Sequence, residues 1–171
     1  MELNGNGFKL RGWKEEDAAA LQRHANNTNI SDFLFDRFPS PYTLGEAVKW
    51  ILIKLNQSPV VNFVIDVNGN LAGVVGIDLR DDIYRKSPLL GYWLREDYWG
   101  KGIMTEAVKL VTAYAFANLD IVRIQAGVLS NNPRSMRVLE KAGYTKEGIL
   151  KNNIIKKGMV LDEHIYGFVK G

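Results

Sequence analysis

The chain has 171 residues, 46% of them hydrophobic and 24% charged, which is typical of one globular domain over residues 1–171. It has no cysteine and two histidines, which excludes disulfides and thiolate metal sites and argues against a histidine-rich metal site. The formal net charge of +3 is spread along the chain, so it does not separate a nucleic acid from a small polyanionic ligand. No apolar run is long enough to cross a bilayer and the start MELNGNG does not resemble a signal peptide, so we expect a cytoplasmic protein.

The first third of the chain predicts one strand followed by two helices. Apolar and polar residues alternate over Phe8–Trp13, as in a half-buried strand, and Glu15–Asn26 has a helical period. Residues 27–42 have no clear period and predict a loop with at most one helical turn. Thr43 and Glu46 have the spacing of a capping box, which predicts the start of the second helix.

The middle of the chain predicts a hairpin and a third strand. Asn62–Val67 and Leu71–Leu79 flank Asn68-Gly69, the dipeptide most typical of a tight hairpin turn. Leu89–Leu94 follows as another short apolar strand.

The last third predicts two helices and three strands. A helix is expected to run to about Asn118, followed by a strand over Ile121–Leu129. Asn132-Pro133 predicts the start of a helix that ends at Gly143. Two final strands are predicted, over Tyr144–Leu150 and Met159–Val169. Together the elements predict an α/β domain with about four helices around a single mixed, mostly antiparallel sheet of about seven strands.

The segment Leu94–Val108 (LREDYWGKGIMTEAV) has the character of an anion site. A strand leads into a turn with Gly100 and Gly102 and then into a helix start, whose unpaired N–H groups attract a phosphate. A nucleotide P-loop would need Ser or Thr directly after Lys101, and the dinucleotide fingerprint would need Gly or Ala in place of Thr105. The remaining alternative is a turn that serves only to start the helix.

Two motifs decide between these alternatives: YWGKGxxTEA over Tyr98–Ala107 and NxxSxxVLEKxGY over Asn132–Tyr144. Together they resemble the GNAT superfamily of acyl-CoA-dependent N-acetyltransferases, and more narrowly its RimJ/RimL branch, whose members acetylate protein N-termini, polyamines and related amines. The order of the predicted elements extends the resemblance from Phe8 to Val169. The resemblance implies the GNAT fold, with a sheet that is splayed in the middle.

The resemblance also implies an acetyl-CoA site without a metal. The pyrophosphate would face the amides from Gly100 to Met104, and the pantetheine arm would run beside Tyr92–Leu94, in a gap where N–H groups polarise the thioester. The residues implied to bind acetyl-CoA are Tyr92, Trp93, Leu94, Trp99, Gly100, Lys101, Gly102, Ile103, Met104, Asn132 and Ser135.

The sequence lacks two of the catalytic residues that the resemblance would imply. Many superfamily members place a tyrosine beside the leaving thiolate, but Leu139 stands at that position. In the RimJ/RimL branch the serine that matches Ser135 is the expected hydrogen-bond donor to sulfur, although it could serve only the helix cap with Asn132. The glutamate that acts as base in RimL enzymes matches Ile154, so the general base is not identified. Ordered water is one alternative, and the other candidates, each of which could be a surface or structural residue, are Asp78, Asp162, Glu163, His24 and His164.

The acceptor amine is expected to bind among the early helices, the 27–42 loop and the 151–160 connection, with Phe33, Phe35 and Phe38 as lining residues. The alternative is that the aromatic residues pack the helices on the sheet, which is favoured for Trp50. Asp32 and Asp36 would attract a cationic amine.

The sequence thus predicts an acetyl-CoA-dependent N-acetyltransferase, monomeric or homodimeric, whose acceptor is a protein N-terminus, a polyamine or another small amine. No nucleic-acid or membrane partner is expected. Two other classes stay open: a non-catalytic acyl-CoA-binding module, suggested by Leu139 and Ile154, and a nucleotide-phosphate binder.

Overall fold

The computed structural model describes all residues of the chain, Met1–Gly171, as a mixed α/β fold. The strands are β1 (Glu2–Gly5), β2 (Phe8–Arg11), β3 (Asn62–Val67), β4 (Asn70–Asp78), β5 (Leu89–Leu94), β6 (Arg123–Leu129), β7 (Thr145–Lys156) and β8 (Met159–Val169). The α-helices are α1 (Ala18–Ala25), α2 (Thr28–Ser31), α3 (Leu44–Leu55), α4 (Ile103–Asn118) and α5 (Pro133–Lys141). Short 3₁₀ helices are η1 (Glu15–Asp17), η2 (Asp82–Tyr84) and η3 (Glu96–Tyr98).

The strands form one mixed sheet in the order β1-β2-β3-β4-β5-β6-β8-β7. This confirms the predicted class of fold and adds β1 to the strands expected from the sequence. No helix combines the length and the apolar character that a membrane crossing requires. The chain folds into two compact units: the first comprises Met1–Gly76 and Tyr92–Ile103, the second Ile77–Gly91 and Met104–Gly171. That residues 1–171 form a single domain stays a prediction.

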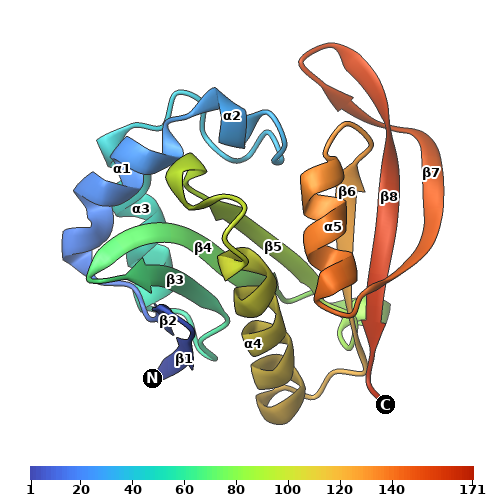
Figure 1. Cartoon of the computed structure of the whole chain (residues 1–171), viewed down its shortest axis with the longest axis horizontal. Helices are drawn as coiled ribbons and strands as arrows, with labels where there is room; N and C mark the ends of the chain where they lie inside the picture. Colours follow the sequence, from blue (N-terminus) through green and yellow to red (C-terminus); the bar gives the residue numbers. More distant parts are fainter. The chain divides into compact units, whose positions relative to one another are not determined.

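The first unit is built on the antiparallel strands β1 to β4, with α1 and α3 packed side by side (Figure 1). The predicted turn at Asn68-Gly69 is confirmed, because both residues have positive φ, 52° and 82°. The Thr43 side chain accepts a hydrogen bond from the Glu46 amide, as the predicted cap of α3 requires. The core of this unit consists of apolar side chains from the helices and the sheet, among them Trp13, Leu21, Ala47, Ile51, Val64, Val74 and Trp93.

A buried ionic network joins the sheet of the first unit to η1. The Arg11 guanidinium donates from Nε to Asp66 Oδ2 at 2.6 Å and from Nη1 and Nη2 to the two Asp17 oxygens at 2.8 Å each. All three residues are buried, at 5–7% exposure. Each charge has a hydrogen-bonded partner of opposite sign, so the network joins β2, β3 and η1 and leaves no buried charge unpaired.

The second unit contains the antiparallel strands β6, β8 and β7 with α4 and α5. One face of these strands packs on the helices: Tyr144 shares a 2.8 Å hydrogen bond with Thr112 of α4, and Tyr166 donates to Glu140 of α5 at 2.9 Å. β5 pairs in parallel with β6 through one residue pair, Leu89 and Gln125.

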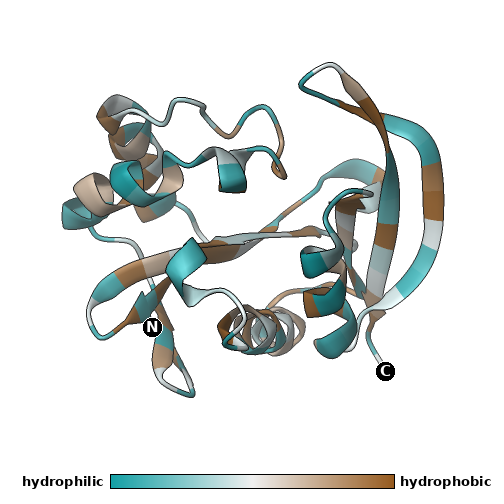
Figure 2. Ribbon diagram, turned by 45° about the horizontal axis from the view of Figure 1, so that its top comes forward, coloured by the Kyte–Doolittle hydropathy of each residue, from teal (hydrophilic) through white to brown (hydrophobic).

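β7 and β8 form a longer hairpin than predicted. Strand residues continue to Lys156, and Lys157-Gly158 makes the turn with φ of 50° and 76°. The predicted end of this strand at Leu150, and the 151–160 segment as a connection between strands, were therefore wrong. The physical reason is that the apolar residues of β7 stand in adjacent pairs, Ile149-Leu150 and Ile154-Ile155, with a hydrophilic stretch between them (Figure 2), so they do not alternate as in a regular strand. The register shifts in that stretch: Leu150 pairs with Glu163, but the next paired residue is Ile154, opposite Leu161.

Candidate functional site

The turn before α4 forms an open backbone cradle. Gly100 and Gly102 have φ of 73° and 79°, values that residues with a side chain rarely adopt. A Cβ built on either glycine meets no atom within 4 Å, so the space in front of both is open. The 16-residue helix α4 begins at Ile103, immediately after the second glycine. Its first amides and its positive dipole end thus follow a turn to which an anion has access.

The segment before the glycines is held firmly to the first unit. The Arg95 amide donates to Ala72 O at 2.8 Å, and the Trp99 indole donates to Leu94 O at 2.7 Å. Two cations lie over the Tyr98 ring, Arg95 at 5.0 Å and Lys101 at 5.4 Å from its centroid. These contacts place the Lys101 ammonium beside the cradle in a defined position.

The predicted cofactor residues fall into two groups. Tyr92 to Ile103 belong to the first unit, whereas Met104, Asn132 and Ser135 belong to the second. The side chains of Trp93, Leu94 and Met104 are buried, at 8%, 8% and 6% exposure, so these three residues have only their backbone to offer a ligand.

The start of α5 agrees with the predicted cap. Asn132 Oδ1 accepts a hydrogen bond from the Ser135 amide at 3.3 Å, and Pro133 occupies the first turn. This bond uses the Ser135 backbone, and the side chain is half-buried. Leu139 is fully buried and is therefore a core residue of the second unit.

The pKa values of three candidate bases, Asp162, His164 and His24, are lowered. Asp162 accepts from the Asn152 amide at 2.9 Å and from Lys151 Nζ at 3.0 Å, and these hydrogen bonds lower its pKa. Burial, then the charge of Lys146, lowers the pKa of His164, whose Nδ1 is buried without a hydrogen-bond partner.

His24 lies in the first unit, where burial and then the charges of Arg95 and Arg23 lower its pKa. Asp78 is the last residue of β4, and Ile154 is a half-buried strand residue paired with Leu161. Glu163 accepts a hydrogen bond from Asn153 Nδ2 at 2.7 Å.

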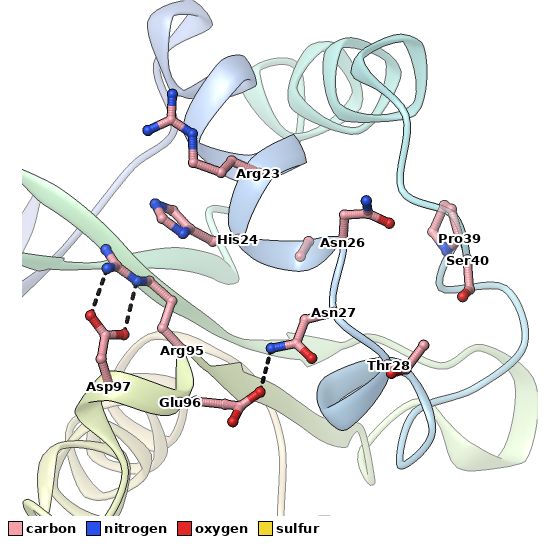
Figure 3. Close-up of a pocket in the computed structure, with 11 residues that line it drawn as sticks. Arg23, His24, Asn26, Asn27, Thr28, Pro39, Ser40, Arg95, Glu96 and Asp97 are labelled. Atoms are coloured by element: carbon pink, nitrogen blue, oxygen red, sulfur yellow. Dashed lines mark hydrogen bonds and ion pairs between the residues drawn. The ribbon is translucent and has the colours of Figure 1, made fainter.

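A polar cavity of about 620 Å³ lies in the first unit, near the end of α1 (Figure 3). Its lining residues come from α1, the start of α2, the segments on either side of α2, and η3 with the residue before it: Arg23, His24, Ala25, Asn26, Asn27, Thr28, Pro39, Ser40, Arg95, Glu96 and Asp97. Glu96 Oε1 accepts hydrogen bonds from Asn27 at 2.6 Å and Asn29 at 2.9 Å. Arg95 forms a two-point ion pair with Asp97, at 3.1 and 2.6 Å. Most of the side chains that line this cavity thus form hydrogen bonds or carry charge, and binding of the acceptor amine here stays a prediction.

The predicted aromatic acceptor residues do not line this cavity. Phe38 packs on the rings of Tyr42 and Trp93, at 5.1 and 6.2 Å between centroids. Phe35 is 52% exposed and stacks with Arg37 at 5.0 Å, and Phe33 is half-buried. Their contact with an acceptor stays a prediction.

The remaining residues named for the acceptor region lie close by in the chain. Trp50 packs against the core of the first unit, as the packing alternative predicts, with Lys54 at 4.3 Å over its ring. Asp32 is half-buried and Asp36 is exposed.

Comparison with known proteins identifies the family. Residues 8–145 match the acetyltransferase (GNAT) domain. The chain belongs to this family. A solved structure of RimL, a ribosomal L7/L12 alpha-N-protein acetyltransferase in complex with coenzyme A, has a TM-score of 0.87 at 22% identity and covers 99% of this chain and 98% of that chain. The GNAT fold predicted from the two motifs is therefore confirmed.

Two relatives in sequence extend the comparison. The probable N-acetyltransferase YjcK of Bacillus subtilis (strain 168) is 50% identical over 80 residues, which span 47% of this chain and 44% of that protein's length. The spermidine N(1)-acetyltransferase of Escherichia coli (strain K12) is 24% identical over 156 residues, 91% of this chain and 82% of that protein. The spermidine enzyme and RimL are thus named for different acceptors, and the name of YjcK gives none.

Proposed function

We propose that this GNAT protein transfers an acetyl group from acetyl-CoA to a primary amine. The observation that carries the proposal is the cradle at Gly100 and Gly102, which is open in front of both glycines and leads directly into α4. A Cβ on either glycine would occupy the space that a diphosphate needs to reach the backbone amides. The residues present therefore fit the pyrophosphate of coenzyme A.

The chain's own groups have distinct roles in this proposal. The amides from Gly100 to Met104 bind the pyrophosphate, and the Lys101 ammonium, held over the Tyr98 ring, adds positive charge beside it. The backbone of Tyr92–Leu94 binds the pantetheine amides. The Ser135 hydroxyl donates a hydrogen bond to the sulfur that leaves, while its backbone amide stays in the Asn132 cap.

The acceptor is a primary amine that must lose a proton before it attacks the thioester. RimL is described as acting on a protein N-terminus, and another relative is named for spermidine. We infer that the acceptor here belongs to the same chemical class, a protein N-terminus, a polyamine or another small amine.

The experiment is a thiol-release assay with acetyl-CoA against a panel of peptide N-termini, polyamines and small amines. Turnover with at least one amine, together with mass-spectrometric detection of the acetylated product, is the expected result. Calorimetry with CoA measures donor binding in the same preparation.

Tight CoA binding without turnover for any amine would instead support an acyl-CoA-binding module. The buried Leu139 and the half-buried Ile154, which stand where relatives carry a tyrosine and a glutamate, are the observations behind that second function. Thermal stabilisation by ATP with magnesium but not by CoA would contradict both functions.

A further inference from the structure

Glu163 lies on the face of the second unit's sheet that is turned away from α5. It pairs with Leu129 of β6 and Leu150 of β7. Side chains alternate between faces along a strand, so Glu163 and Tyr166 point to opposite sides. Because the Tyr166 hydroxyl bonds Glu140 of α5, the Glu163 carboxylate is on the face without that helix.

A glycine and an asparagine determine where this carboxylate sits. A Cβ added at Gly127 would overlap Glu163 Oε1, so the carboxylate occupies the space that the missing side chain leaves. Asn153 Nδ2 donates to the other oxygen, Oε2, at 2.7 Å. One carboxylate oxygen is thus fixed by an amide, and the second lies over the β6 backbone.

Asn153 reaches Glu163 because β7 is bulged. Lys151, Asn152 and Asn153 stand opposite the single residue Asp162, whose two oxygens bond the Asn152 amide and the Lys151 ammonium. Asn152 has a positive φ of 52°, which such a bulge accommodates. The Asp162 carboxylate therefore has a structural role in the bulge.

The same end of β6 leads into the start of α5. Glu163 pairs with Leu129, the last residue of β6, and the neighbouring Asp162 carbonyl accepts from the Ser130 amide at 3.0 Å. Two residues later Asn132 caps α5, and its partner is Ser135. We propose that Glu163 is the general base that deprotonates the acceptor amine, with Asn153 and Gly127 positioning its carboxylate; this rests on the proposed acetyltransferase function.

The proton and electron balance is complete without another reactant. Glu163 Oε1 takes one proton from the ammonium, and the freed lone pair on nitrogen forms the bond to the thioester carbon. When the tetrahedral adduct collapses, the C–S bond breaks with its electron pair on sulfur. The second nitrogen proton goes to that sulfur, assisted by the Ser135 hydroxyl, and Glu163 returns its proton to water.

The charged groups around Glu163 leave it available for this role. On its own strand Asp162 and His164 point to the opposite face, and on β7 Lys151 is engaged with Asp162. Further along the same face Arg123 and Glu147 pair with each other in a two-point ion pair. Among these neighbours, Glu163 accepts a hydrogen bond only from the neutral side-chain amide of Asn153. None of the cations named here is paired with its carboxylate, so the carboxylate can pair with the ammonium group of a substrate.

The test compares kcat/KM for the amine across pH in the full-length protein. With Glu163 present, the ammonium form is bound and deprotonated on the enzyme, so kcat/KM stays nearly constant over neutral pH up to the pKa of the substrate amine, about 10.4 for an alkyl amine. The Glu163→Gln variant has no base, so it reacts only with amine that is already deprotonated in solution. Its kcat/KM is therefore expected to rise about tenfold per pH unit over the same range. At neutral pH its kcat falls about 100-fold, while KM for acetyl-CoA stays unchanged.

A matched pair of glycine variants tests the positioning. Gly127 and Gly148 flank Ile165 from β6 and β7, but a Cβ at 148 meets no atom within 4 Å. Gly127→Ala displaces the carboxylate and is expected to lower kcat on the order of tenfold. Gly148→Ala should keep the wild-type kcat. Melting temperatures of all variants show whether each is folded.

Two results would overturn the proposal. If wild-type protein turns over and both Glu163→Gln and Gly127→Ala retain its rate and pH profile, Glu163 is not the base, and the acetyltransferase function stands. If wild-type protein releases no thiol with any amine of the panel, the proposed function and the base both fall.

Discussion

Replacing Gly102 by alanine separates the strain of the turn from the binding of a phosphate. Gly102 has a φ of 79°, and its added Cβ meets no protein atom within 4 Å. The protein therefore loses only the backbone preference, about 1 kcal/mol of unfolding free energy. A pyrophosphate at the amides would also be pushed away by the methyl group. Each hydrogen bond lost to a charged group costs about 1.5–3 kcal/mol, so CoA should bind about 10- to 100-fold more weakly.

Gly7 is a matched control for this experiment. Its φ is also 79°, a Cβ there also meets nothing within 4 Å, and it lies in the turn between β1 and β2. Gly7→Ala should cost the same unfolding free energy in urea as Gly102→Ala and leave CoA binding unchanged in calorimetry. Equal CoA affinities for the two variants would refute the assignment of the cradle to the pyrophosphate.

Three further predictions concern single side chains. Ser135→Ala keeps the Asn132 cap, because the cap uses the Ser135 backbone amide, and should lower kcat by about tenfold or more at an unchanged melting temperature; unchanged turnover at saturating acetyl-CoA would show that the hydroxyl takes no part. Arg11→Met leaves two buried carboxylates without their cation and should lower the free energy of unfolding in urea by about 3–5 kcal/mol, so a loss below about 1 kcal/mol would contradict the importance of the network. Burial raises the pKa of Tyr144 from 10.0 to about 12, so the folded state holds this proton more tightly than the unfolded chain. The free energy of unfolding should therefore fall as pH rises from 10 toward 12, less steeply in Tyr144→Phe; equal slopes would be evidence against this cause.

Local motifs were sufficient to predict many parts of the fold. The Asn68-Gly69 turn, the Thr43 cap of α3 and the Asn132 cap of α5 each depend on residues within four positions of one another. The same holds for the cradle, where Gly100 and Gly102 directly precede α4. Local turns and helix caps of this kind can be predicted from the sequence because the interacting residues are neighbours in the chain.

The elements that escaped prediction have weak local patterns. β1 has a single large apolar residue, Leu3, although Asn6-Gly7 after it is the same hairpin dipeptide that identified the later turn. β7 lacks a period of two, because its apolar residues stand in the adjacent pairs Ile149-Leu150 and Ile154-Ile155, and its register shifts where three residues face Asp162.

The side-chain arrangements at the candidate sites come from distant residues. Glu163, Gly127 and Asn153 meet from three strands, and Asn27 meets Glu96 across 69 positions. Such contacts follow from strand order and register, which a single sequence does not specify. The register, and not the sequence alone, places Glu163, one of several candidate carboxylates, on the face away from α5.

The bulge in β7 also affects the free edge of the sheet. β7 is the last strand of the sheet, so one side of its 12 residues offers backbone groups to which another chain could hydrogen-bond. Register shifts at Lys146/Gly148 and Leu150/Ile154 divide that edge into short pieces, and Lys146 and Lys151 add charge to it. An incoming strand would find no long regular ladder to extend. Straightening β7 by deleting the bulge would therefore remove a protection against edge-to-edge aggregation along with the support of Glu163.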